Sequence, residues 1–75
     1  MSDLNNTNYA FKNAFDLFKD NNVNEALEQL EEILKVYPKD KDSLDLIILI
    51  YIKTNKPNKA IQFVNRCISL FPDDI

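Results

Sequence analysis

A chain of 75 residues is long enough for one small domain, which buries only about 60% of the surface of its unfolded chain. Its 12 acidic and 9 basic residues give a net charge of -3, which offers no general attraction to nucleic acid or to an anionic membrane. With one cysteine and no histidine, an internal disulfide is impossible and no metal-ligand set stands out, so we expect no cofactor and a cytoplasmic protein.

The first six residues are polar and rich in asparagine, which predicts a frayed end. Asn6 or Thr7 can cap a first helix, because a short side-chain oxygen accepts a hydrogen bond from the free amides of the first turn. Asp20-Asn21-Asn22 should end this helix, since asparagine tolerates a left-handed backbone. Two apolar stripes run along the helix, Ala10, Ala14 and Leu17 on one side and Phe11, Phe15 and Phe18 on another.

A second helix is expected to start at Asn22, with Glu25 completing a pair that resembles a capping box. It should stop before Pro38, because the residue that precedes a proline avoids helical angles. One side is acidic, and we interpret it as a solvated face because there is no histidine to support a metal or catalytic site. The acidic side holds Glu25, Glu28, Glu31 and Glu32, and the apolar side holds Ala26, Leu27, Leu30, Ile33, Leu34 and Tyr37.

Residues 44 to 52 are the most apolar stretch of the chain, interrupted only by Asp45. Their composition also suits a buried strand, but Asp40 is a good helix cap and the flanking sequence favours a third helix. A helix that is apolar all round must be covered nearly all round. The stretch is under half the length that a membrane span requires, so we expect no membrane span.

A fourth helix is predicted from Lys56-Pro57, because proline suits the first helical position, and Pro72 should end it. Cys67 lies on its apolar stripe and is expected to be an inert, small hydrophobic residue. A basic edge of Lys53, Lys56, Lys59 and Arg66 lacks interleaved exposed aromatic residues, so an acidic protein surface suits it better than nucleic acid. The side expected to be buried comprises Ala60, Ile61, Val64, Cys67, Ile68 and Phe71.

The two halves of the chain match at a fixed offset of 34 residues with no insertion. Two antiparallel helices repeating at this period are typical of one kind of helical solenoid. Small residues recur where the helices of a pair must approach closely, at Ala14, Ala26 and Ala60. The matched pairs are Asn21 with Asn55, Asn24 with Asn58, Ala26 with Ala60, Pro38 with Pro72 and Asp40 with Asp74.

The chain resembles the tetratricopeptide repeat family over residues 6 to 75. The resemblance implies an all-α fold in which four helices form two helix-turn-helix hairpins of a short right-handed α-solenoid. Residues 1–75 would be a single domain, with repeat 1 at about 6–39 and repeat 2 at about 40–73. The family's pattern falls on Ala10, Asn13, Ala14, Leu17, Ala26, Leu30 and Pro38 in the first unit, and on Leu44, Ile47, Ile48, Tyr51, Ala60, Val64 and Pro72 in the second.

By this resemblance, the first helix of each unit lines a concave inner surface, and the chain is a protein-binding module rather than an enzyme. Some members hold a carboxylate there with basic residues, but here the middle of the surface is apolar. It therefore suits an apolar helix or peptide segment of a partner. The residues expected to bind are Phe11, Phe15, Phe18, Lys19, Leu46, Leu49, Ile52 and Lys53.

Two alternatives remain open from the sequence. In the first, the chain is a homodimeric scaffold, because about three repeats are normally needed to bury a continuous core and a symmetric dimer is the commonest remedy. Such a dimer would use the inner surface for self-contact. In the second, which again follows from the resemblance, the chain is an accessory or chaperone-like subunit that shields an apolar segment of its partner.

Overall fold

The computed structural model describes the backbone of residues 3–74 and the side chains of residues 9–73. Four α-helices follow one another: α1 (Asp3–Lys19), α2 (Val23–Val36), α3 (Lys41–Lys53) and α4 (Pro57–Leu70). A single 3-10 turn, η1 (Pro72–Asp74), follows α4, and none of the described residues lies in a strand. The all-α prediction is therefore confirmed, and the stretch from 44 to 52 is helical.

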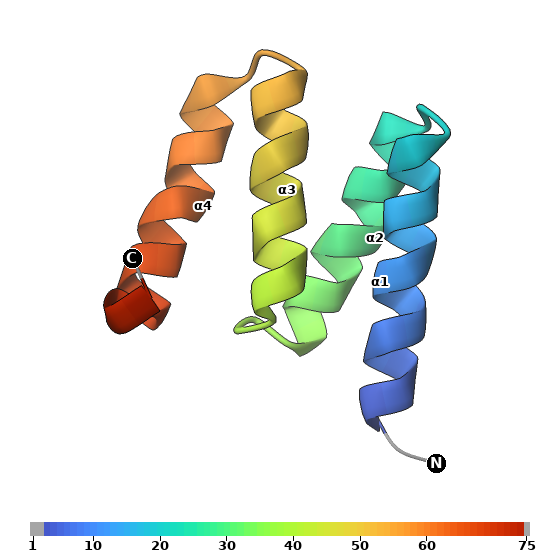
Figure 1. The fold of residues 1–75 in the computed structure, drawn as a ribbon, viewed down its shortest axis with the longest axis horizontal. Coiled ribbons are helices and arrows are strands. Elements are labelled where there is room, and N and C mark those ends of the chain that lie inside the picture. The colour runs from blue at the N-terminus through green and yellow to red at the C-terminus, as the bar shows by residue number, and fades with distance from the viewer. Residues whose placement is uncertain (1–2, 75) are drawn as a thin grey trace.

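The helices pack as two hairpins that lie side by side. Helix α1 packs on α2, and α3 packs on α4, while α2 and α3 join the hairpins and α1 also touches α3. In Figure 1, α1 (blue) and α3 (yellow) run in the same direction, and α4 (orange) stands at one end of the row. Among the described elements, α4 packs only against α3 and η1, so its far side has no neighbour.

Both hairpins turn through the same backbone structure, 34 residues apart. Asn21 and Asn55 adopt left-handed angles, with φ of 70° and 62°. The amide after each of them donates back to the first helix of its hairpin, Asn22 N to Leu17 O and Lys56 N to Tyr51 O, both at 2.8 Å. These bonds form a Schellman motif with asparagine in the position that usually belongs to glycine. The predicted role of Asn21 is confirmed.

The helix starts agree only in part with the sequence prediction. Asp40 caps α3 as expected, and Pro57 lies in the first turn of α4. Asn22 precedes α2, but its side chain makes no capping hydrogen bond. Helix α1 begins at Asp3, so the predicted caps Asn6 and Thr7 lie inside the helix, and Met1 and Ser2 lie outside the described residues. A cap worth only about 1 kcal/mol does not fix one helix start among several residues of capping type.

Replacing Asp40 by alanine is expected to lower the free energy of unfolding by about 1–2 kcal/mol. The Asp40 carboxylate accepts hydrogen bonds from the Ser43 amide at 3.2 Å and from the Ser43 hydroxyl. Because Ser43 is fully buried, the change also leaves a buried hydroxyl without its acceptor. Urea unfolding followed by circular dichroism measures the loss. The matched control is Asn22→Ala, which removes a capping residue that makes no such bond; equal losses in the two variants would contradict this role of Asp40.

The core lies where α2 and α3 meet, with α1 and α4 on either side. Ala14 and Ala26 are fully buried and Ala60 nearly so, which agrees with the close helix approach inferred from their size. The buried side predicted for α2 is confirmed in large part, since Leu27 and Tyr37 are half-buried and the rest are enclosed. The core residues are Ala14, Ala26, Leu30, Ile33, Leu34, Leu44, Leu46, Ile47, Ile50, Tyr51 and Ala60.

The buried side predicted for α4 is wrong for half of its residues. Only Ala60 is buried, while Cys67 and Phe71 are half-buried and Ile61, Val64 and Ile68 are exposed. Periodicity identifies which residues share a side of a helix, but it cannot say whether another element covers that side. Helix α2 has α1 and α3 against it, whereas α4 has α3 alone among the other helices.

Candidate protein-binding surfaces

An aromatic row runs along the exposed side of α1. The rings of Phe11 and Phe15 stack with centroids 6.3 Å apart and planes inclined by 18°. One turn later, the Lys19 Nζ lies 5.5 Å from the centroid of the Phe15 ring, within cation–π range. Spacings of four place the three residues on one side of the helix. Phe15 remains 41% exposed, so its ring is available to a ligand.

The corresponding row on α3 carries Leu49, which is 39% exposed, and the exposed Lys53 one turn later. Leu49 and Lys53 stand 34 residues after Phe15 and Lys19, and α1 and α3 contact each other. We call the surface formed by the two rows the inner surface. Its residues are Phe11, Phe15, Lys19, Leu49 and Lys53.

Three of the residues predicted for this surface lie elsewhere. Leu46 is only 5% exposed and belongs to the core, and Phe18 is half-buried against that core. Leu46 stands on the side of α3 that other helices cover. Because α3 is apolar on nearly every side, its sequence does not indicate which side is covered. Ile52 is 60% exposed, but it lies four residues after Ile48 and shares that residue's side of α3.

The inner surface is apolar at its centre and basic at one end. Lys19 and Lys53 both lie in the last turn of their helices, and α1 and α3 run in the same direction, so both ammonium groups lie at the same end (Figure 1). Asp42 lies in the first turn of α3, at the opposite end. A bound segment would therefore meet positive charge at one end and negative charge at the other, which fixes its direction.

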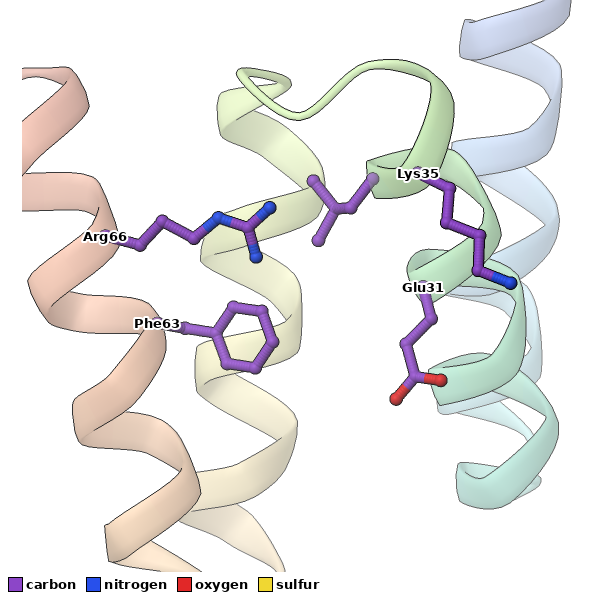
Figure 2. Close-up of a pocket in the computed structure, with 5 residues that line it drawn as sticks. Glu31, Lys35, Phe63 and Arg66 are labelled. Atoms are coloured by element: carbon purple, nitrogen blue, oxygen red, sulfur yellow. The ribbon is translucent and has the colours of Figure 1, made fainter.

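A hollow of about 370 Å³ opens between α2 and α4, on a side that sequence analysis did not single out. Figure 2 shows Phe63 and Arg66 entering it from α4, with Glu31 and Lys35 on the α2 side. The Arg66 guanidinium lies 5.6 Å from the centroid of the Phe63 ring, so a cation covers part of the apolar lining. Charges of both signs at its edge make this hollow less suited to an apolar ligand than the inner surface.

Tyr51 connects this hollow to the core. The Tyr51 ring stacks on the Phe63 ring with centroids 5.9 Å apart. The Lys59 Nζ lies 6.0 Å from the centroid of the Tyr51 ring. Burial raises the pKa of the Tyr51 hydroxyl, and the nearby Glu31 carboxylate raises this pKa further. Tyr51 therefore remains a neutral packing residue at neutral pH.

The outer side of the second hairpin, which we call the end face, is a third surface. Its α3 row consists of positions 41, 45, 48 and 52, and its α4 row consists of positions 61, 64 and 68. A hollow of about 290 Å³ lies between the rows, and the Lys41 Nζ lies 3.3 Å from an Asp45 carboxylate oxygen beside it. The residues of the end face are Lys41, Asp45, Ile48, Ile52, Ile61, Val64, Cys67, Ile68 and Phe71.

Cys67 lies at the floor of the end face, half-buried between the rows. Burial raises the pKa of its thiol, and the Asp45 carboxylate raises it further, while Lys41 and Arg66 act in the opposite direction. A thiol with a raised pKa is a weak nucleophile at neutral pH. This agrees with the expectation that Cys67 serves as a small hydrophobic residue.

Within the described part of the chain, no three His, Cys, Asp or Glu side chains gather closely enough to hold a metal ion. None of the helices there combines the length and the apolar character that crossing a membrane requires. Comparison of the chain with protein families, curated proteins and solved structures found no match.

Proposed function

We propose that the chain is a two-repeat module of the tetratricopeptide kind. It binds an apolar helical segment of another protein along the inner surface and carries out no reaction of its own. The 34-residue register supports the repeat, because Asn21 and Asn55 give the two hairpins the same turn. The stacking of the second hairpin on the first, through α2 and α3, supports a short right-handed solenoid with α1 and α3 on its concave side.

The observation that carries the proposal is the exposure of Phe15 and Leu49. They occupy equivalent positions in the two units, and about two fifths of each remains accessible on neighbouring helices. Phe11 stacks on Phe15 and so holds its ring in place. Apolar side chains that are held in place but still accessible form the centre of most protein interfaces, because a partner buries them at little further cost in conformational entropy.

The charges at the two ends of the inner surface select how a partner lies. Lys19 and Lys53 favour an acidic residue at one end of the bound segment, and Asp42 favours a basic residue at the other. All three side chains are exposed, so their effect is on orientation and association rate more than on affinity, and salt should weaken it. The ligand class is thus an amphipathic helix with apolar residues at spacings of three and four and opposite charges at its ends.

Leu49→Glu is expected to weaken the binding of such helices by about 100-fold or more, because the interface would bury a carboxylate at its apolar centre. An ion pair with Lys53, one turn later, does not repay the cost of removing that carboxylate from water. Peptides selected by the wild-type chain from a displayed library of amphipathic helices serve as the ligands, and fluorescence anisotropy measures their affinity. The matched control is Val36→Glu, which adds the same charge at a position of α2 that is 67% exposed and does not belong to the inner surface.

Circular dichroism must first show that both variants fold, which the exposure of Leu49 and Val36 leads us to expect. The selected peptides should also shift the NMR signals of Phe15 and Leu49 rather than those of the α2–α4 hollow. If Leu49→Glu and the wild-type chain bound the peptides equally well, or if the peptides shifted Phe63 and Arg66 instead, the inner surface would not be the binding site.

A further inference from the structure

The end face carries four of the eight exposed large hydrophobic residues in the described part of the chain. Ile61 is 54% exposed and Ile68 is 45% exposed, and Val64 and Ile52 are exposed beside them. Isolated exposed hydrophobic residues are ordinary, but here four lie in two adjacent rows around a hollow lined by Ile48 and other side chains. Figure 1 shows α4 at the edge of the row, with no helix beyond it.

Comparison of the two units indicates that this face is built for packing. The residues 34 positions before Ile61, Val64 and Ile68 are Leu27, Leu30 and Leu34, and all three belong to the core or pack against it, where α2 meets α3. The residues 34 positions before Ile48 and Ile52 are Ala14 and Phe18, which also lie in the core or against it. The second unit therefore presents the same kind of surface that the first unit buries.

The opposite end of the row does not complement the end face. On α3, Leu46, Ile47 and Ile50 are buried in the core. The residues 34 positions earlier on α1 are all polar: Lys12, Asn13 and Asp16. Lys12 and Asp16 form an ion pair at 3.7 Å. A second copy stacked head to tail would bury these groups against apolar side chains, which costs more than the contact provides.

A second copy offers two apolar surfaces, its inner surface and its own end face. The end face is the better match, because its charges balance within the face, whereas the inner surface carries Lys19 and Lys53 at one end. The charged groups of the end face are one cation, Lys41, and one anion, Asp45, so two such faces carry no net charge and do not repel each other. When two copies meet about a two-fold axis, an arrangement that places the lysine of one copy near the aspartate of the other is available. Ile48, Val64 and Ile68 then lose their contact with water on both copies.

We infer that two copies of the chain form a symmetric dimer through their end faces. The contact leaves the inner surface open, so this assembly is independent of the proposed ligand site and would carry two such sites. It also differs from the dimer expected from the sequence, in which self-contact consumed the inner surface. Because only two short helices contribute from each copy, we expect an interface at the small end of the usual range, with dissociation in the micromolar range.

Sedimentation equilibrium of the full chain tests the inference directly. The wild-type mass should rise from 8.8 kDa toward twice that value across the micromolar range. Val64→Glu and Ile61→Glu should each raise the dissociation constant by about 100-fold or more, because each buries an unpaired charge in the contact. Val36→Glu, with the same chemical change on α2, should dimerise like the wild-type chain. A wild-type chain that stayed at 8.8 kDa throughout would overturn the inference.

A charge exchange tests whether the contact is the end face meeting itself. Lys41→Glu makes both charges of the face acidic, and Asp45→Lys makes both basic, so each variant alone should be monomeric. An equimolar mixture of the two should form a heterodimer, because an acidic face then meets a basic one. If the mixture remained monomeric while the wild-type chain dimerised, the two charges would not face each other and the end-face dimer would be excluded.

Two further measurements separate this inference from the proposed ligand site. Alkylation of Cys67 by iodoacetamide should slow as protein concentration rises through the dimerisation range, because Cys67 lies between the two rows of the end face. A constant alkylation rate during dimerisation would contradict the contact.

Leu49→Glu should lose peptide binding and still dimerise, whereas Val64→Glu should become monomeric and still bind peptide. Loss of dimerisation in Leu49→Glu alone would move the contact to the inner surface and overturn the inference.

Discussion

An Ile47→Ala chain is expected to lose about 2–5 kcal/mol of its free energy of unfolding, and its melting temperature should fall by about 10–25 °C. Ile47 is completely buried in the middle of α3, at the contact between the hairpins. Truncation removes three buried carbon atoms and leaves a cavity that the surrounding helices fill only in part. A domain of this size has a total stability of about 4–11 kcal/mol, so the loss is a large part of it.

Asn13→Ala is the matched control for this prediction. Asn13 stands 34 residues before Ile47, at the equivalent position of α1, but its side chain is exposed. Its replacement should change the free energy of unfolding by less than about 0.5 kcal/mol. Thermal and urea unfolding of both variants give the comparison. Similar losses at the two positions would mean that α1 and α3 are covered to the same extent, which contradicts the burial of Ile47.

The helix boundaries that depend on local chemistry could be predicted from the sequence. Asp40 caps a helix because its side chain reaches an amide three residues away, and Asn21 ends one because its own backbone tolerates a positive φ. Neither effect needs a distant part of the chain. The start of α1 was predicted too late, because the first seven residues include several of capping type and the local preference among them is weak.

Burial of a particular side chain could be predicted only where both neighbours of a helix were known. Helix α2 lies between α1 and α3, so its apolar side is covered as expected. Helices α3 and α4 are apolar on more sides than the other helices cover. The sequence therefore placed Leu46 on the surface and Ile61 in the core, whereas Leu46 is buried and Ile61 is exposed.

The candidate sites likewise differ in whether they could be predicted from the sequence. The inner surface could be proposed because the resemblance to a repeat family implies that the first helix of each unit lines it, and Phe15 and Leu49 occupy equivalent positions of those helices. The α2–α4 hollow could not, because it depends on where Arg66 lies over Phe63. The sequence predicted that the α4 row of the end face is buried, whereas Ile61, Val64 and Ile68 are exposed. The contribution of Ile48 and Ile52 to that face became apparent only when α3 and α4 were placed side by side.

Replacing Ala26 by leucine is expected to lower the free energy of unfolding by about 1–3 kcal/mol, because it adds three carbon atoms to a region without free volume. Ala26 is fully buried on α2, which α1 and α3 both contact. The added side chain can be accommodated only by moving two helix contacts at once. The melting temperature should fall by about 4–20 °C, as differential scanning calorimetry can measure.

Ala60→Leu is the informative control, because Ala60 occupies the equivalent position of α4 and is also buried. Among the other helices α4 contacts α3 alone, so it can shift outward and relieve the strain, and we expect a loss below about 1 kcal/mol in dilute solution. A cost equal to that of Ala26→Leu at low protein concentration would show that α4 is held as firmly as α2.

If two copies join through their end faces, the outward shift of α4 is blocked in the dimer. The cost of Ala60→Leu should then rise with protein concentration while that of Ala26→Leu stays constant.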